Sequence, residues 1–421
     1  MSKLHKYAFS DLYDISSGIS STKKQAGHGA PFVSFSTVFN NYFLPDELPD
    51  LMDTSAVDQE KCSVKKGDIL ITRTSETVDE LAMSCVVLKD YPKATFSGFV
   101  KRLRPKTTGI AYDKYMSFFL RSEYFRKVIN AKTIMTLRAS FNEDIFSFLD
   151  LYLPDYEEQV KIGDFLYNIE KKIQCNKKIN DNLQHQLKLL YDYWFTQFDF
   201  PDENGKPYRA SGGAMVWCDA LHQNIPVNWN ISSLGEICSF KNGINYEKDE
   251  IGNKQYKIVN VRNITASQML LDPNSFDTIT LSDKKADKYL IEANDFLIAR
   301  SGSPGATRLL IPSTIPTIYC GFIICCSTSC ELKNYIALTL KKLEIANDTK
   351  SSGSILKNVS QDTLKEIMLC IPQSKVLDSF NSKANSIIKA MQVTIEENNT
   401  LTALRDWLLP MLMNGQATIS D

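Results

Sequence analysis

Two segments of the sequence place an arginine directly before small hydroxyl residues. These segments are Arg73-Thr74-Ser75 and Arg300-Ser301-Gly302-Ser303. A guanidinium group donates two parallel hydrogen bonds that match the O6 and N7 atoms of guanine, and serine or threonine hydroxyls reach base edges or phosphates. Glycines at Gly302 and Gly305 let a backbone approach a ligand closely. The residue types therefore favour recognition of nucleic-acid bases by these two loops.

Other basic and polar residues are candidates for contact with DNA in both halves of the chain. They are Lys23, Lys24, Lys101, Arg102, Arg104, Arg138, Ser140, Lys241, Asn242, Arg262, Arg308, Lys350, Ser352 and Ser354. A single residue of this kind is more often a solvated surface residue than a DNA contact. Because such residues recur at equivalent places in the two halves, DNA contact is a better interpretation for the group than for any one member. The net charge is −1 at pH 7, so DNA binding requires the basic residues to gather on one face.

The elements that must position these loops occur twice in the sequence. Residues 149–154 and 367–372 are strand-like apolar stretches that end in a proline, at an offset of 218 residues. Further upstream, residues 64–75 resemble 291–302, and Ser97-Gly98-Phe99-Val100 resembles Cys320-Gly321-Phe322-Ile323. The repeat predicts two related globules, each followed by a long helix.

Each long helix carries a seam, defined here as the residues spaced alternately four and three apart. The seams are Ile162, Leu166, Ile169, Ile173, Asn176, Asn180, Leu183, Leu187 and Leu190, and Phe380, Ala384, Ile387, Met391, Thr394, Asn398, Leu401, Arg405 and Leu408. This period predicts a coiled coil in which Asn176, Asn180, Thr394 and Asn398 are polar residues that fix the register. The alternative is that each helix packs only on its own globule. Pro410 should end or kink the second helix just after Leu409.

The sequence therefore predicts an α+β protein with mixed α/β globules, largely antiparallel sheets and two long helices. The expected segments are a first globule at 1–155, a first helix at 156–200, a linker with a second globule at 201–373, and a second helix with the C-terminal segment at 374–421. Two unlike globules held apart by a rigid spacer could measure the distance between two unlike DNA half-sites.

Sequence motifs of catalysis are absent. The chain contains no Pro-Pro dipeptide for an adenine methyltransferase motif and no Gly-x-x-x-x-Gly-Lys-Ser/Thr phosphate loop. Its 4 histidines and 10 cysteines have no metal-ligand spacing, and Cys320, Cys325, Cys326 and Cys330 are expected to be buried. We expect no catalytic residues, no metal site, no bound cofactor and no membrane span.

Several motifs in order resemble the specificity subunits of Type I restriction-modification systems over nearly the whole chain. They are Pro154-Asp155-Tyr156-Glu157-Glu158-Gln159, Trp194-Phe195-Thr196-Gln197-Phe198-Asp199-Phe200-Pro201, Ile225-Pro226-Val227-Asn228-Trp229, Leu234-Gly235-Glu236, and the segment from Leu404-Arg405-Asp406-Trp407-Leu408 to Gly415. The second helix lacks a Glu-Gln pair at its start, which puts in doubt a symmetric partner contact through Glu158 and Gln159.

The resemblance implies two target recognition domains that bind double-stranded DNA, and spacer helices that pair antiparallel. It further implies two methyltransferase (M) subunits that carry S-adenosylmethionine, restriction (R) subunits that use ATP and Mg²⁺, and a bacterial cytoplasmic location. Trp194, Phe195, Trp407 and Leu408 would then be candidates for docking the methyltransferase, or alternatively would fasten each helix to its own globule.

Two other functions remain open from the sequence. The chain could be a coiled-coil scaffold that joins two proteins without touching DNA, which its near-neutral charge would suit. It could also be a specificity-like protein of another defence system.

Overall fold

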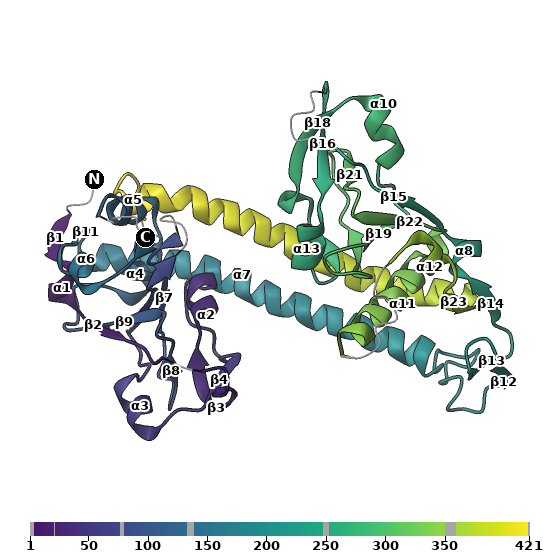
Figure 1. Cartoon of the computed structure of the whole chain (residues 1–421), viewed down its shortest axis with the longest axis horizontal. Coiled ribbons are helices and arrows are strands. Elements are labelled where there is room, and N and C mark those ends of the chain that lie inside the picture. The colour runs from purple at the N-terminus through teal and green to yellow at the C-terminus, as the bar shows by residue number, and fades with distance from the viewer. Residues whose placement is uncertain are drawn as a thin grey trace. The chain divides into compact units, whose positions relative to one another are not determined.

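The computed structural model describes residues 4–20, 22–75, 80–132, 139–246, 252–349 and 359–419. The chain divides into two compact units. Unit 1 consists of Met1–Gln174 together with Thr400–Asp421, and unit 2 consists of Cys175–Asn399. Both units combine helices with sheets, as the sequence predicts (Figure 1).

Unit 1 is built around a four-stranded antiparallel sheet. Its strand order is β2 (Tyr13–Ser17), β9 (Val100–Pro105), β5 (Ile69–Thr72) and β7 (Ser84–Val86). The smaller sheets are β4 (Asp50–Met52), β3 (Ala26–Val33) and β8 (Thr95–Phe96); β1 (His5–Ala8) with β11 (Asp150–Leu153); and β6 (Thr74–Ser75) with β10 (Ala139–Ser140).

Short helices and aromatic side chains close the core of unit 1. The helices are α1 (Phe9–Leu12), α2 (Phe35–Asn40), α3 (Ala56–Lys61), α4 (Asp113–Phe119), α5 (Glu123–Lys132) and α6 (Glu143–Ser147). Phe125 lies 6.2 Å from Phe9 and 6.0 Å from Phe119 between ring centroids. All three rings are buried, so α1, α4 and α5 are joined mainly by aromatic packing.

Unit 2 repeats this plan with a five-stranded sheet. Its order is β15 (Ser239–Asn242), β22 (Ile323–Ser327), β19 (Asp295–Ala299), β20 (Thr307–Leu310) and β17 (Leu270–Leu271). The smaller sheets are β18 (Asp277–Leu281), β16 (Lys254–Val259) and β21 (Thr317–Tyr319); β14 (Asn230–Ser233) with β23 (Met368–Ile371); and β12 (Met215–Cys218) with β13 (Gln223–Pro226). The helices are α8 (Leu234–Ile237), α9 (Val261–Ala266), α10 (Asp283–Ala286), α11 (Cys330–Thr349) and α12 (Gln361–Lys365), with 3-10 turns η3 (Pro273–Ser275) and η4 (Asp287–Tyr289).

The correspondence between the units extends to individual backbone contacts. β3 pairs parallel with β8 in unit 1, and β16 pairs parallel with β21 in unit 2, although most other ladders are antiparallel. A Cβ on Gly18 would lie 2.3 Å from the Phe96 carbonyl oxygen, and a Cβ on Gly243 would lie 2.1 Å from the Cys320 carbonyl oxygen. Glycine is therefore required at the same crossing of two backbones in each unit.

Two long helices contribute to both units. Helix α7 (Tyr156–Tyr191) continues into the π-helical turn η2 (Asp192–Thr196), and α13 runs from Ser374 to Met413 (Figure 1). The unit boundary falls after Gln174 in α7 and after Asn399 in α13. The structure thus assigns the first half of α7 and the last part of α13 to the same unit.

The sequence predicts that Pro410 ends or kinks the second helix just after Leu409. The structure shows that Pro410 does not end α13. The helix continues to Met413, with Pro410 inside its last turn. Leu412 and Met413 are buried in the core of unit 1. Their burial offsets the backbone hydrogen bond that a proline cannot donate.

Candidate nucleic-acid interface

Arg73 lies just beyond the end of β5, opposite Phe99. Strands β5 and β9 are antiparallel with Thr72 opposite Val100, and the Arg73 backbone N–H donates to the Phe99 carbonyl oxygen at 2.8 Å. This hydrogen bond lies one residue beyond the last pair of the ladder, and Phe99 itself lies in the turn before β9. Thr72 and Val100 are buried, whereas Arg73 and Phe99 are exposed. Arg73 and Phe99 are thus two exposed residues that one backbone hydrogen bond joins at the end of this ladder.

Arg300 occupies the same place in unit 2. Ala299 of β19 lies opposite Ile323 of β22, and the Arg300 N–H donates to the Phe322 carbonyl oxygen at 2.9 Å. Ala299 and Ile323 are buried, whereas Arg300 and Phe322 are exposed. The two arginines singled out by the sequence thus have equivalent and accessible positions.

The hydroxyl residues after each arginine are held differently in the two units. In unit 1, Thr74 and Ser75 form β6, and Thr74 pairs with Ser140 of β10. In unit 2, Ser301 and Ser303 lie in a bend in which Gly302 and Gly305 have φ values of 82° and 87°. Unit 1 therefore presents its hydroxyls from a short ladder, and unit 2 presents them from a glycine-dependent loop.

Five further candidates are exposed. Lys23 and Lys24 lie in the turn between β2 and β3, and Lys241 and Asn242 lie on β15. Arg262 is exposed on α9 and forms an ion pair with Asp277. These side chains are accessible to a polyanion.

Lys101, Arg102 and Arg104 of β9 make hydrogen bonds within unit 1, and their role as DNA contacts stays a prediction. Arg102 donates to the Ser63 carbonyl oxygen at 2.6 Å, and Lys101 donates to the Ser17 hydroxyl at 2.8 Å. The Arg104 Nε and Nη2 atoms reach the two carboxylate oxygens of Asp68 at 2.7 and 2.6 Å. Each of the three cationic groups therefore has at least one oxygen partner within unit 1.

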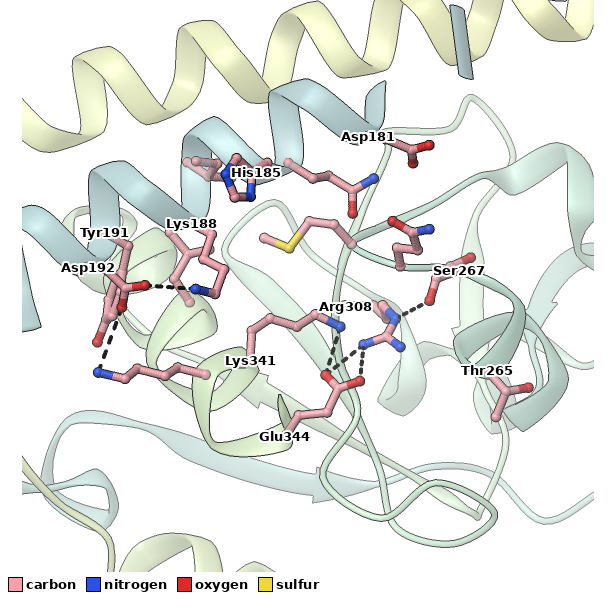
Figure 2. Close-up of a pocket in the computed structure, with 16 residues that line it drawn as sticks. Asp181, His185, Lys188, Tyr191, Asp192, Thr265, Ser267, Arg308, Lys341 and Glu344 are labelled. Atoms are coloured by element: carbon pink, nitrogen blue, oxygen red, sulfur yellow. Dashed lines mark hydrogen bonds and ion pairs between the residues drawn. The ribbon is translucent and has the colours of Figure 1, made fainter. Parts of the chain in front are cut away.

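Arg308 of β20 is also buried, and its role as a DNA contact likewise stays a prediction. Its Nη1 donates to both Glu344 carboxylate oxygens at 3.1 and 2.9 Å, and its Nε donates to the Ser267 carbonyl oxygen at 2.6 Å. Figure 2 shows this pair, with Lys341 beside it, on the wall of a cavity of about 500 Å³ that Asp181 of α7 also lines. Arg308 therefore joins β20 to α11.

Four predicted candidates lie outside the described residues. They are Arg138, Lys350, Ser352 and Ser354.

The polar seam residues contact one another within unit 2. Asn176 Nδ2 donates to Asn398 Oδ1 at 2.9 Å and to Glu397 Oε2 at 2.7 Å. Thr394 Oγ1 donates to Asn180 Oδ1 at 2.7 Å. Asn176 and Asn180 are buried. The four residues chosen from the sequence thus meet as two hydrogen-bonded pairs.

A charged pair takes the corresponding place in unit 1. Arg405 Nη1 donates to Glu170 Oε2 at 2.7 Å, and both side chains are largely buried. The Arg405 guanidinium also lies 4.9 Å from the ring centroid of Tyr42. This explains why a seam position that is Leu187 in the first helix is an arginine in the second.

The four candidate docking residues separate into two groups. Trp194 and Phe195 are buried, and their rings lie 5.7 and 4.6 Å from that of Phe380, so they fasten η2 to the core of unit 2. This favours the alternative in which they fasten the helix to its own globule. Leu408 is partly buried against the core of unit 1. Trp407 is 66% exposed and remains available to a partner.

Gln159 has a structural role at the start of α7. Its Nε2 donates to the carbonyl oxygens of Ile110 and Pro154 at 2.8 and 2.9 Å, and its Oε1 accepts from the Tyr112 N–H at 3.0 Å. Gln159 is buried, so its absence from the second helix concerns local packing and not a partner contact.

Sequence reasoning missed two sets of exposed residues. Phe99 and Phe322 belong to the sequence repeat, but their position beside the arginines follows only from the strand register. Leu189, 50% exposed, lies 218 residues before Trp407 and could have been found by applying the repeat to exposed positions. Comparison of the two halves of the repeat could therefore have identified both the phenylalanine pair and the Leu189–Trp407 pair.

Cys320, Cys325 and Cys326 are buried as expected, whereas Cys330 is exposed. Among the described residues, no group of histidine, cysteine, aspartate and glutamate side chains is arranged to hold a metal ion. No helix in the described ranges combines the length and the apolar character needed to cross a membrane.

Comparison with known proteins gives concordant findings. The family model for the Type I restriction modification DNA specificity domain matches residues 1–185 and 226–402. The chain is 25% identical to the Type I restriction enzyme HindI specificity subunit of Haemophilus influenzae, over 91% of this chain and 94% of that protein. It is 24% identical to the MjaIX specificity subunit of Methanocaldococcus jannaschii, over 86% and 81%. The crystal structure of the Type I S subunit from M. genitalium superposes with a TM-score of 0.57 at 16% identity, over 98% of this chain and 96% of that one.

Proposed function

The chain belongs to the family of Type I restriction modification DNA specificity proteins, and from this premise we propose that units 1 and 2 are two target recognition domains. Each unit would read one half of an interrupted double-stranded DNA target. Because the loops after Arg73 and Arg300 differ in sequence and backbone form, the two half-sites should differ.

The observation that carries this proposal is the equivalent placement of Arg73 and Arg300. In each unit the arginine continues a central strand by one backbone hydrogen bond to an exposed phenylalanine, at 2.8 Å and 2.9 Å. A rigid strand end is suited to presenting a guanidinium to a base edge, because its backbone position varies little. Arginine is the commonest reader of guanine in the major groove.

We further propose that α7 and α13 pair as an antiparallel coiled coil along their length. This is supported by the pairs Asn180–Thr394 and Asn176–Asn398 within unit 2 and Glu170–Arg405 within unit 1. The partner's number rises along α13 as the number falls along α7, as antiparallel helices require. Such a spacer would set the distance between the half-sites.

The chemistry of the assembled enzyme would lie in partner subunits. In this proposal two M subunits carry S-adenosylmethionine, R subunits use ATP and Mg²⁺, and this chain binds no cofactor of its own in the bacterial cytoplasm. Trp407 and Leu189, exposed at equivalent seam-flanking positions, are proposed as the docking points for the M subunits.

Charge reversal at Arg300 tests the function. The full chain, produced with its M subunits, is titrated with the duplexes that it selects from a randomised pool. We expect Arg300→Glu to weaken binding by about 1–3 kcal/mol, a roughly 5- to 150-fold loss. Arg209→Glu is the matched control, because Arg209 is also exposed in unit 2 but lies in the loop after η2.

Two results would contradict the proposal. A wild-type chain that selects no sequence from the pool would favour a scaffold that never touches DNA. Equal binding by the Arg300→Glu and Arg209→Glu variants would remove Arg300 from the interface.

A further inference from the structure

We propose that Phe99 and Phe322 are specificity-determining residues, each contacting the C5-methyl group of a thymine beside the guanine read by the arginine opposite it. This inference rests on the proposed function and adds a second base contact to each half-site. It also names the chemistry of that contact, which is apolar and directed at a methyl group.

The first support is the exposure of two large apolar side chains at one structural position. Phe99 is 60% exposed and Phe322 is 62% exposed. Leaving much of a phenylalanine ring in water forgoes part of the stabilisation that its burial would give. A single exposed apolar side chain needs no explanation. An exposed phenylalanine that recurs at equivalent positions of two diverged units does need one. Phe148, 73% exposed, does not recur, because Glu366 stands at the equivalent position.

The second support is the rigidity of the turn that presents each ring. In unit 1 the Val100 N–H donates to the Ser97 carbonyl oxygen at 2.9 Å, and the Gly98 N–H donates to the Ile19 carbonyl oxygen at 2.7 Å. In unit 2 the Ile323 N–H donates to the Cys320 carbonyl oxygen at 2.9 Å. Both turns are therefore closed by the same backbone hydrogen bond, so each phenyl ring projects from a fixed point.

The turn is also fixed from the neighbouring strand. The Ile19 N–H donates to the Phe96 carbonyl oxygen, and the Ile244 N–H donates to the Tyr319 carbonyl oxygen, both at 2.9 Å. Gly18 and Gly243 stand next to these contacts where a Cβ would overlap the facing backbone. A solvent-exposed turn held so closely is suited to docking on a partner of defined shape.

The third support is the arginine beside each ring. The backbone N–H of Arg73 or Arg300 lies 2.8 or 2.9 Å from the carbonyl oxygen of Phe99 or Phe322, so both side chains of a pair start from adjoining backbone positions. Arg73 can therefore bind guanine while Phe99 reaches a thymine methyl nearby, and Arg300 and Phe322 can do the same in the other half-site. The guanidinium charge complements the DNA, and the ring supplies contact area without a charge of its own.

Replacing thymine by uracil tests the contact directly, because uracil lacks only the C5-methyl group. The wild-type complex is first used to select a duplex, and each thymine of that duplex is then replaced singly by uracil. We expect a loss of about fourfold at one thymine in each half-site, the effect of one methyl group. In Phe99→Ala the loss should vanish in one half-site only, and in Phe322→Ala it should vanish in the other only.

The controls separate this proposal from the function on which it rests. Phe148→Ala should keep both uracil effects, and Phe99→Leu should keep most of them, since leucine still offers an apolar contact. If the wild-type complex selects a duplex but is indifferent to uracil at every position, or if both alanine variants keep both effects, the inference is wrong and the proposed function stands. If no duplex is selected, the proposed function fails first.

Discussion

Arg73 and Arg104 belong to the same sheet of unit 1 and have opposite surroundings. Arg73 extends beyond the end of β5 into solvent, whereas Arg104 of β9 binds the buried carboxylate of Asp68 through two hydrogen bonds. That carboxylate also accepts from the Lys65 N–H at 2.8 Å, and hydrogen bonding to Asp68 raises the pKa of Arg104. Position relative to the strand end decides whether a basic residue serves the fold or the surface.

We expect Arg104→Met to destabilise unit 1, because it leaves the Asp68 carboxylate buried without its cation. Removing one partner of a fully buried pair costs about 3–5 kcal/mol, and the partial exposure of Arg104 reduces this to about 2–3 kcal/mol. Urea denaturation measures the free energy of unfolding. Lys106→Met, which removes an exposed pair with Asp14 at 3.3 Å, should cost less than about 1 kcal/mol. Equal costs for the two variants would show that Asp68 does not need Arg104.

At this scale the sequence predicted the two arginine loops but not the roles of the other cations. Lys101, Arg102 and Arg308 resemble surface residues by type, and their neighbours in the sequence do not reveal that carbonyl oxygens and carboxylates surround them. These partners come from other strands and helices. Only the strand register, which depends on the whole fold, brings them together.

The long helices show how polar residues in an apolar seam can bind one another, although the buried Asn176 Oδ1 accepts no hydrogen bond from the described residues. Asn180 and Thr394 form one hydrogen bond across the two helices within unit 2, and Asn176 donates to two acceptors on α13. In an apolar seam such pairs lower the stability that leucines would give, but they favour one alignment of the helices.

We expect Thr394→Val to destabilise unit 2 by about 1–2 kcal/mol, because the buried Asn180 carbonyl oxygen loses its donor. The double variant Asn180→Leu with Thr394→Val should recover that loss or exceed the wild type, since both polar groups are then removed. A double-mutant cycle on thermal unfolding measures the coupling. Ser386→Ala is the control, because the Ser386 hydroxyl is exposed and donates to the Ser382 carbonyl oxygen of its own helix at 2.9 Å. Additive effects in the cycle would contradict the pairing.

At the scale of elements, much of the fold could be read from the sequence. The repeat and the seam predicted the mixed helix and sheet composition and the two long helices, because hydrophobic periodicity reflects which face is buried. The continuation of α13 past Pro410 and the short β6–β10 ladder could not be predicted. The first depends on burial of Leu412 and Met413, and the second pairs residues far apart in the chain.

For the whole molecule, the net charge of −1 means that any attraction to DNA must come from local groups. Exposed lysines occur in each unit, among them Lys24 in the turn before β3 and Lys241 on β15. Such residues are suited to phosphate contacts, which add affinity without base preference.

We expect Lys24→Ala and Lys241→Ala each to reduce the slope of log K against log salt concentration by about one. The selected sequence should be unchanged, because phosphates are the same along any duplex. Affinity measured at several salt concentrations gives the slope. Lys206→Ala, an exposed lysine in the loop after η2, should leave the slope unaltered. A changed base preference in either lysine variant would place that residue at a base instead.

Unit 1 is discontinuous in the chain, because residues beyond Asn399 complete a core that the first 174 residues begin. Leu409, Leu412 and Met413 are buried in that core. During synthesis on a ribosome, all residues of unit 2 emerge before residues 400–421 of unit 1. Until those residues emerge, part of the hydrophobic core of unit 1 is uncovered. We therefore expect the usual order, in which the N-terminal domain folds first, to be reversed. A message cut short near codon 400 would yield a chain with a folded unit 2 and an incompletely folded unit 1. Cellular proteases could degrade this truncated chain before it entered an assembly.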